Sequence, residues 1–371
     1  MRVYLLVMLV AAVVTYLTTP LARWVAIRTG AVTALRARDV HAVPTPRLGG
    51  LAMLAGIAVA LLFASRIPFL AGVFTASNEA WAILTGATLV CLLGIADDIW
   101  DLDWMTKLVG QVLAAGLMAW QGVQLITVPI AGVTIGSSRL SLVATVLVVV
   151  VAMNAVNFVD GLDGLAAGLI AIGGAAFFGY TYLLTQDASP SDYSDLASLV
   201  TVVLVGACLG FLPHNFHPSR IFMGDSGSML IGLTMAAAAI VVTGRIDPER
   251  VSEGQSIPAF LPILIPLAVL VLPLLDMILA VVRRLLAGKS PFHPDRMHLH
   301  HRLLALGHTH RRAVLIMYLW TAVFAFGCAA LILFTPAQVV AGLVVAFLAA
   351  LALTLGPLRG SGKVPEHERT L

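Results

Sequence analysis

Long apolar runs are the feature that most limits how this chain can fold. A helix needs about 20 consecutive apolar residues to cross the hydrocarbon core of a bilayer, and it satisfies its own backbone hydrogen bonds there. If runs of roughly 17–25 residues are taken as spans, the sequence predicts an all-α polytopic integral membrane protein. About eleven transmembrane helices are expected, near residues 3–22, 49–64, 80–96, 107–120, 140–157, 165–185, 196–213, 228–243, 258–282, 313–334 and 338–356.

The composition supports this class. Hydrophobic residues make up 60% of the 371 residues and charged residues 11%, whereas soluble domains carry about 25% charged residues. The first apolar run continues to Leu21 and meets an Arg-rich loop, so we expect an uncleaved span and not a signal peptide. We predict a single transmembrane domain over 1–356 with a tail at 357–371, and a short external hairpin at 122–139, where β-branched residues alternate with Pro and Gly.

The positive charges are distributed unevenly between the two sets of loops. Most Lys and Arg residues fall in one set, with the largest group between 283 and 312. Loops rich in Lys and Arg stay in the cytoplasm. We therefore expect the N-terminus outside and the C-terminus in the cytoplasm.

The segment 154–168, NAVNFVDGLDGLAAG, places polar groups at the end of an apolar span. Asn154, Asn157 and Asp160 recur every three residues, so they share one inclined face of a helix. Polar groups at such a border are costly unless they serve a site. Their oxygens suit Mg²⁺, which prefers hard ligands and keeps places for water and phosphate. The alternative is a polar helix end followed by a Gly-rich turn.

A second acidic group ends the third predicted span, in DDIWDLDWMTK. Asp97, Asp98 and Asp101 can share one helical face. Carboxylates so close repel one another, so a metal, a cationic substrate or a raised pKa is needed to keep them together. Lys107 follows and could meet a phosphate. A solvated acidic turn is the alternative.

Two shorter motifs lie on the same predicted face. Asp225 stands between glycines in FMGDSGS, where the backbone can approach a ligand closely. In PTPRLGG, at 44–50, the prolines exclude a continuing helix. Arg47 of this loop either contacts substrate or only satisfies the topology.

The loop 283–312 is the longest and most basic on the predicted cytoplasmic side. His298, His300 and His301 cluster within it and could bind a transition metal. The surrounding Lys and Arg residues favour a phosphate instead, because cations oppose a bound metal and attract an anion. Anchoring to anionic lipid is a further alternative. In the span before this loop, Asp276 is expected to pair with a neighbouring helix, with catalysis as the second possibility.

Taken together, these motifs resemble those of the polyprenyl-phosphate N-acetylhexosamine-1-phosphate transferases, and most closely the branch that uses GlcNAc. The resemblance rests on the order and spacing of DDIWDLD at 97–103, NAVNFVDGLDGLAAG at 154–168, GDSGS at 224–228 and SPFHPDRMHLHHRLL at 290–304, with PTPRLGG in front. It implies transfer of GlcNAc-1-phosphate from UDP-GlcNAc to undecaprenyl or decaprenyl phosphate, with release of UMP. This is the first membrane step in making a cell-envelope glycopolymer.

The resemblance also implies residue roles. It implies Mg²⁺, with Mn²⁺ as a substitute, held by Asn157 and Asp225. It implies catalysis or acceptor activation by Asp97 and Asp98. Contacts to the substrates would come from Lys107, Asn154, Asp160, Asp163, Phe222 (against uracil), His298, His300, His301, Arg302 and Arg47.

Three alternatives remain at this stage. A phospho-MurNAc-pentapeptide transferase shares the acidic motifs but has a different histidine loop. Another hexosamine could replace GlcNAc. A secondary transporter would also carry intramembrane acids, although its site would lie near the midplane between inverted repeats, and no repeat is visible. The expected partners are the two substrates and the lipid bilayer, without nucleic acid; a homodimer is compatible with the sequence.

Overall fold

The computed structural model describes residues 1–32, 44–125, 137–188, 195–243, 256–286, 288 and 299–355, except for the side chains of 256–260, 262, 263 and 300. Helices dominate these ranges, and the only β-pairing within them is the isolated bridge between Val32 and Pro46. The helices are α1 (Arg2–Thr29), α2 (Gly49–Ala64), α3 (Pro68–Ala76), α4 (Glu79–Trp100), α5 (Trp104–Trp120), α6 (Ser138–Val159), α7 (Leu165–Ala188), α8 (Leu196–Asn215), α9 (Gly224–Thr243), α10 (Ser256–Val269), α11 (Val271–Leu286), α12 (Leu299–Ala305), α13 (His310–Ala329), η2 (Ala330–Ile332) and α14 (Pro336–Leu355).

The predicted fold class, an all-α polytopic membrane protein, is confirmed. Eight helices in the described ranges are long and apolar enough to cross a membrane, or up to nine if α2 and α3, bent by 103° at the break between them, form one span. The total of eleven spans stays a prediction. The predicted external hairpin lies for the most part outside the described residues.

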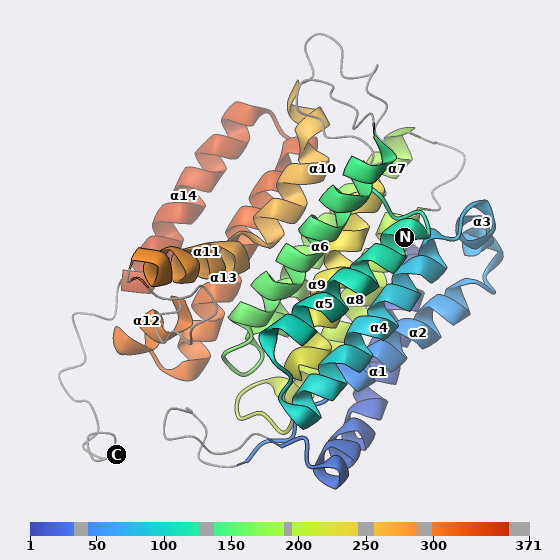
Figure 1. The fold of residues 1–371 in the computed structure, drawn as a ribbon. Helices are drawn as coiled ribbons and strands as arrows, with labels where there is room; N and C mark the ends of the chain where they lie inside the picture. The colour runs from blue at the N-terminus through green and yellow to red at the C-terminus, as the bar shows by residue number, and fades with distance from the viewer. Residues whose placement is uncertain are drawn as a thin grey trace.

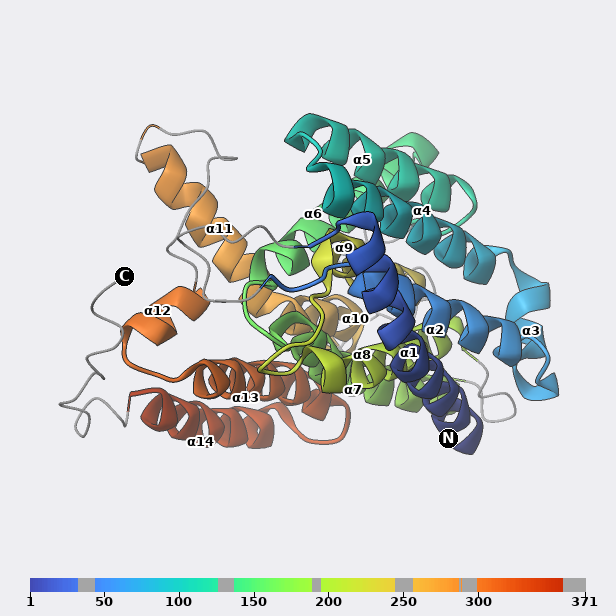
Figure 2. The same ribbon diagram turned by 90° about the horizontal axis from the view of Figure 1, so that it is seen from below.

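α9 lies at the centre of the bundle. Of the residues in its most apolar stretch, 94% are buried, whereas the figures for the peripheral helices α1 and α14 are 28% and 11%. α9 packs mainly against α4 and α6, and also against α2 and α8 (Figures 1 and 2). Side chains at the start of α9 therefore lie among other helices.

In the predicted span over 258–282, the prolines Pro262, Pro266 and Pro273 predict a kink or break, and the structure has one. The chain forms α10 and α11, separated at Leu270, and α11 runs crosswise to α10 (Figure 1). Pro273 explains the break, because it has no N–H to donate to the carbonyl of Val269, where α10 ends. In the first turn of the new helix α11 the missing donor costs nothing.

The motif-bearing segments gather at one end of the bundle. α4 and α6 end there and α9 and α13 begin there, at the lower end in Figure 1. Segments that lie far apart in the sequence thus meet on one face, as the sequence predicted.

Candidate active site

The junction between α4 and α9 is built around Asp98. Its Oδ1 accepts the backbone N–H of Asp225 at 3.1 Å, and its Oδ2 accepts that of Ser226 at 3.2 Å. The carboxylate therefore caps the first turn of α9, where backbone donors have no partner within their own helix. Gly224 enters this turn at φ 70, and a side chain there would collide with the Asp98 carboxylate. The G-D-S-G motif thus supplies backbone donors to Asp98 and leaves room for its carboxylate, in addition to any contact with a ligand.

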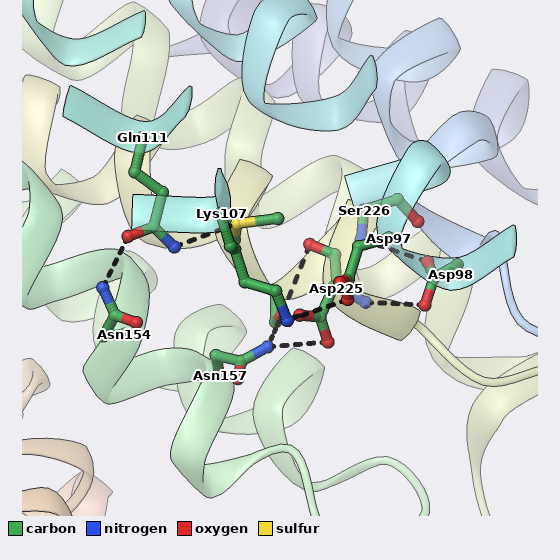
Figure 3. Close-up of polar contacts among 10 residues, drawn as sticks. Asp97, Asp98, Lys107, Gln111, Asn154, Asn157, Asp225 and Ser226 are labelled. Carbon is green, nitrogen blue, oxygen red and sulfur yellow. Dashed lines mark hydrogen bonds and ion pairs between the residues drawn. The ribbon is translucent and has the colours of Figure 1, made fainter. Parts of the chain in front are cut away.

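Lys107 links the two other carboxylates of the site. Its Nζ lies 2.8 Å from Asp97 Oδ2 and 2.6 Å from Asp225 Oδ2 (Figure 3). Asp97 and Asp98 are buried, and Asp225 is partly buried. Counted with Asp98, three carboxylates face one ammonium, which leaves an excess of negative charge in a poorly solvated place. A divalent cation or a proton would relieve it.

Asp97 differs from Asp98 in what its oxygens contact. Its Oδ2 is paired with Lys107, but its Oδ1 is buried without a hydrogen-bond partner among the described residues. A buried acceptor that lacks a donor is costly. This oxygen is therefore the one in the cluster that is poised to receive a proton or a ligand.

Asn157 completes the cluster from α6. Its Nδ2 donates to Asp225 Oδ1 at 3.0 Å and to Ser228 Oγ at 2.9 Å. Both hydrogen bonds use the amide nitrogen, so the amide oxygen is left to act as a ligand. Asn157, near the end of α6, and Asp225, at the start of α9, are therefore in direct contact, while their predicted binding of Mg²⁺ stays a prediction.

Asn154 lies one turn deeper in α6 and has a different environment. Its Nδ2 donates to Gln111 Oε1 at 2.7 Å, and Gln111 in turn donates to the sulfur of Met229 at 3.1 Å (Figure 3). These contacts join α5, α6 and α9 inside the bundle. They favour a structural role for Asn154, and its predicted contact with the nucleotide stays a prediction.

Asp160 follows the last residue of α6 and is half-buried. Removal from water, reinforced by the nearby carboxylates of Asp225 and Asp98, raises the pKa of Asp160 to about 7. The charge of Arg47 acts against this rise. Arg47 thus lies close enough to influence the 154–168 segment, which the sequence alone left open.

Asp163 is buried beneath the loop that follows Asp160. Its Oδ2 accepts from His217 Nδ1 at 2.7 Å and from the backbone N–H of Ser219 at 3.1 Å, while its own N–H donates to His310 Nε2 at 3.2 Å. These contacts tie together the loops before α7 and α9 and the start of α13. They favour a structural role over the nucleotide contact predicted for Asp163.

Asp163, His217 and His310 bring potential metal ligands together, with ligand atoms within 4.8 Å of one another. However, the two imidazole rings are stacked, with centroids 4.3 Å apart and planes 19° from parallel. A metal binds in the plane of an imidazole ring, at the nitrogen lone pair, and two stacked planes do not meet at one ion. We therefore interpret the group as a hydrogen-bonded cluster.

The loop 44–50 reaches the same end of the bundle. Phe222 donates its backbone N–H to Pro46 O at 2.8 Å and accepts at its own carbonyl from Gly49 N at 3.0 Å. This pairing places the PTPRLGG loop beside the start of α9. The predicted stacking of the half-buried Phe222 on uracil is compatible with the position and stays a prediction.

The predicted histidine segment is described only in part. His298 and the side chain of His300 lie outside the described residues. His301 is half-buried and Arg302 is exposed, both on α12. Among the described residues, α12 packs mainly against α13.

Sequence reasoning missed several residues that build this site. Gln111 stood out only as a polar residue within an apolar run, and Ser226 and Ser228 only as parts of the GDSGS motif at 224–228. His217 and His310 gave no signal, because their partner Asp163 is distant in the sequence.

Comparisons with known proteins agree with the motifs. Residues 80–243 match the sequence profile described as glycosyl transferase family 4. A protein of Mycolicibacterium smegmatis named decaprenyl-phosphate N-acetylglucosaminephosphotransferase is 46% identical over 98% of this chain and 90% of its own length. A protein of Bacillus subtilis named probable undecaprenyl-phosphate N-acetylglucosaminyl 1-phosphate transferase is 32% identical over 85% and 82%. A phospho-N-acetylmuramoyl-pentapeptide-transferase of Desulforudis audaxviator is 30% identical over 76% and 83%.

Proposed function

The chain belongs to the polyprenyl-phosphate N-acetylhexosamine-1-phosphate transferases, and we propose that it transfers GlcNAc-1-phosphate from UDP-GlcNAc to a polyprenyl phosphate, forming polyprenyl-diphospho-GlcNAc and UMP. One observation carries this proposal at the level of chemistry. The buried, net-negative cluster of Asp97, Asp98, Lys107 and Asp225 lies at the end of the bundle where motifs from four helices meet. Joining two phosphates requires such positioning and charge neutralisation more than covalent chemistry.

In the reaction, an oxygen of the acceptor phosphate attacks the sugar-bearing phosphorus of UDP-GlcNAc. The bond from that phosphorus to the oxygen bridging it to UMP breaks, and UMP leaves with the bond electrons. The acceptor phosphate, with a second pKa of about 6, arrives partly protonated. Asp97 Oδ1, which has no donor among the described residues, would take this proton.

Asp98 has less freedom to act as a base. Both of its oxygens accept backbone N–H groups at the start of α9. We assign it the task of holding Asp225 in place, so Asp98 is a positioning residue and Asp97 is the catalytic one. Lys107, between Asp97 and Asp225, is placed to contact a substrate phosphate once a substrate displaces one of its present partners.

The donor set suits Mg²⁺, and Mn²⁺ as a substitute. Asp225 offers carboxylate oxygens, Asn157 offers an amide oxygen, and the surrounding negative charge exceeds the positive. Asp225 and Asn157 would hold the ion, with Ser228 hydrogen-bonded behind Asn157. When bound, it supplies neutralisation of the charge that develops on the departing UMP.

Contacts to the nucleotide sugar are proposed for Asp160, Phe222 and Arg47 near the cluster, and for the histidine segment with His298, His300, His301 and Arg302. The peptidoglycan enzyme is the second candidate, because a relative of that name covers much of the chain. The higher identity to proteins named for GlcNAc favours the first candidate.

The experiment is a transfer assay with membranes that overproduce the chain. Labelled UDP-GlcNAc, other UDP-hexosamines and UDP-MurNAc-pentapeptide are each incubated with undecaprenyl or decaprenyl phosphate and Mg²⁺, with EDTA as a control. We expect a lipid product only with UDP-GlcNAc, UMP as the second product, and no turnover in EDTA. A lipid product formed from the muramyl-pentapeptide donor alone would overturn the assignment.

We further propose that the protein is a multi-pass protein of the bacterial plasma membrane with this site facing the cytoplasm, the N-terminus outside and the C-terminus inside. Cysteines introduced at 101–103, 161 and 219 should resist an impermeant thiol reagent in intact cells and react after permeabilisation. Labelling of any of them from outside would contradict the single-face arrangement.

A further inference from the structure

The helix α11 buries two charged residues, Asp276 and Arg284. Leu272, Asp276, Ala280 and Arg284 recur every four residues and are buried, which places them on one face. The rest of the helix exposes large apolar side chains, among them Leu275, Ile278 and Val282. Lipid accounts for the apolar outside, but buried charges in such a helix need partners inside the protein.

Asp276 has its partner in the histidine segment. The side chain is 0% exposed, and Oδ1 accepts the backbone N–H of Leu299 at 2.8 Å. Leu299 is the first residue of α12, the helix that carries His301 and Arg302. A helix of seven residues is unstable alone, and its first N–H groups have no partner within the helix. The carboxylate of Asp276 therefore supplies a fixed attachment for α12.

Two turns further along the same face of α11, Arg284 contacts α6, the helix that carries Asn157. Its guanidinium carbon lies 5.4 Å from the ring centroid of Phe158, a cation–π distance. Phe158 directly follows Asn157 in α6, and α11 packs against α6. One face of α11 thus contacts both the histidine segment and the end of α6.

We propose that Asp276 is a positioning residue, which through the inner face of α11 sets where the histidine segment stands relative to the Asn157–Asp225 cluster. The inference rests on the proposed function, since it assigns the histidine segment to the nucleotide sugar. Asp276 touches no reacting atom in this scheme. Its loss should disturb donor binding first and the chemical step less.

The test compares Asp276→Ala and Asp276→Asn with Asp195→Ala. Asp195 is a matched control, because its Oδ2 accepts the N–H of Ser198 at 2.8 Å near the start of α8, on a helix whose other end lies at the candidate site. For Asp276→Ala we expect the KM for UDP-GlcNAc to rise about 10-fold. This is the size of effect expected if the free energy lost with a helix cap appears fully in donor binding. The kcat and the KM for polyprenyl phosphate should stay within about threefold. Asp276→Asn keeps an accepting oxygen and should recover most of the loss.

Hydrogen exchange of residues 299–305, measured by mass spectrometry on the full-length protein, gives an independent readout. It should accelerate in Asp276→Ala, less in Asp276→Asn, and not in Asp195→Ala. Unchanged exchange in this segment, or an Asp276→Ala variant that loses kcat and both substrate affinities together, would overturn the proposal. If Asp276→Ala does not fold, Asp276→Asn decides by the same criteria.

Failure of the proposed function would look different. A wild-type protein that makes no lipid-linked GlcNAc removes the assignment of the donor, whereas the exchange measurement still reports whether Asp276 holds α12.

Discussion

The acidic cluster and the histidine segment differ in how they are held. Asp97, Asp98, Asn157 and Asp225 are joined across α4, α6 and α9 by direct hydrogen bonds and by the Lys107 ion pairs, around the most buried helix of the bundle. α12 is a single short helix attached by Asp276 and by packing on α13. A phosphoryl-transfer centre needs fixed charges, and only the first region holds a network of them across several helices. This difference agrees with our proposal that the chemical step takes place in the first region and that the second adds contacts to the nucleotide sugar.

The largest expected effect falls on Asp97. Asp97→Asn should lower kcat by about 10²–10⁴-fold, the usual value of a positioned proton transfer. The binding of UDP-GlcNAc should stay within about threefold, because Asp225 and Asn157 are untouched. The measurement is turnover at saturating substrates, with Asp101→Asn, the neighbouring carboxylate of the same motif, as the control. Turnover of Asp97→Asn close to that of wild type would mean that Asp97 is not the base.

Asp98→Asn should act in another way. An amide offers one oxygen where Asp98 now accepts two N–H groups, so one donor at the start of α9 loses its partner. The loss is of the order of 1–3 kcal/mol, and we expect a lower thermal midpoint together with reduced turnover. Differential scanning fluorimetry of the detergent-solubilised variants separates the two acids. An Asp98→Asn variant that is fully stable but inactive would mean that Asp98, and not Asp97, is the base.

In the histidine segment we expect smaller, donor-specific effects. His301→Ala and Arg302→Ala should raise the KM for UDP-GlcNAc by about 10-fold, the scale of one charge-assisted hydrogen bond, with little change toward polyprenyl phosphate. Steady-state kinetics with each substrate varied in turn will decide. A raised requirement for the lipid with unchanged donor KM would mean that this segment binds the acceptor, and the comparison above would fail.

The smallest effect concerns pH and Asp160. Because its pKa is raised to about 7 in the folded protein from an ordinary value of 3.8, the folded state holds the proton more tightly. Its contribution to stability is greatest below pH 3.8 and is lost as pH rises through 7. We therefore compare the thermal midpoints of metal-free wild type and Asp160→Asn. The difference between them should shift in favour of Asp160→Asn as the pH rises from 5 to 8. Asp103→Asn is the control, since hydrogen bonds from Thr106 lower the pKa of Asp103, away from this window. Parallel curves for wild type and Asp160→Asn would show that Asp160 carries no such shift.

Part of this structure could be predicted because the sequence signal is local. Long apolar runs locate the spans, and the motif resemblance named Asn157 and Asp225 together, which are hydrogen-bonded in the structure. The roles of Asp97 and Asp98 could not be separated in this way. Adjacent in sequence, they point to different neighbours, and only the packing of α4 on α9 gives Asp98 its two backbone donors.

Other features depend on contacts between distant residues. Nothing local shows that Asp163 is held by His217 or that Asp276 contacts Leu299. The prolines of the apolar run 258–282 predict a break, but the sequence alone does not show at which of Pro262, Pro266 and Pro273 the chain turns. A proline within an apolar run removes one helix hydrogen bond, but whether the helix bends or ends there depends on the surrounding packing.

The central claim is that Asp225 and Asn157 hold the metal against the donor, while Asp97 acts on the acceptor. Calorimetric titration of UDP-GlcNAc into the purified wild type, Asp225→Asn and Asp97→Asn, with and without Mg²⁺, tests it most directly. We predict Mg²⁺-dependent binding in the wild type and in Asp97→Asn, and its loss in Asp225→Asn. Mg²⁺-dependent binding that persists in Asp225→Asn and disappears in Asp97→Asn would contradict the account.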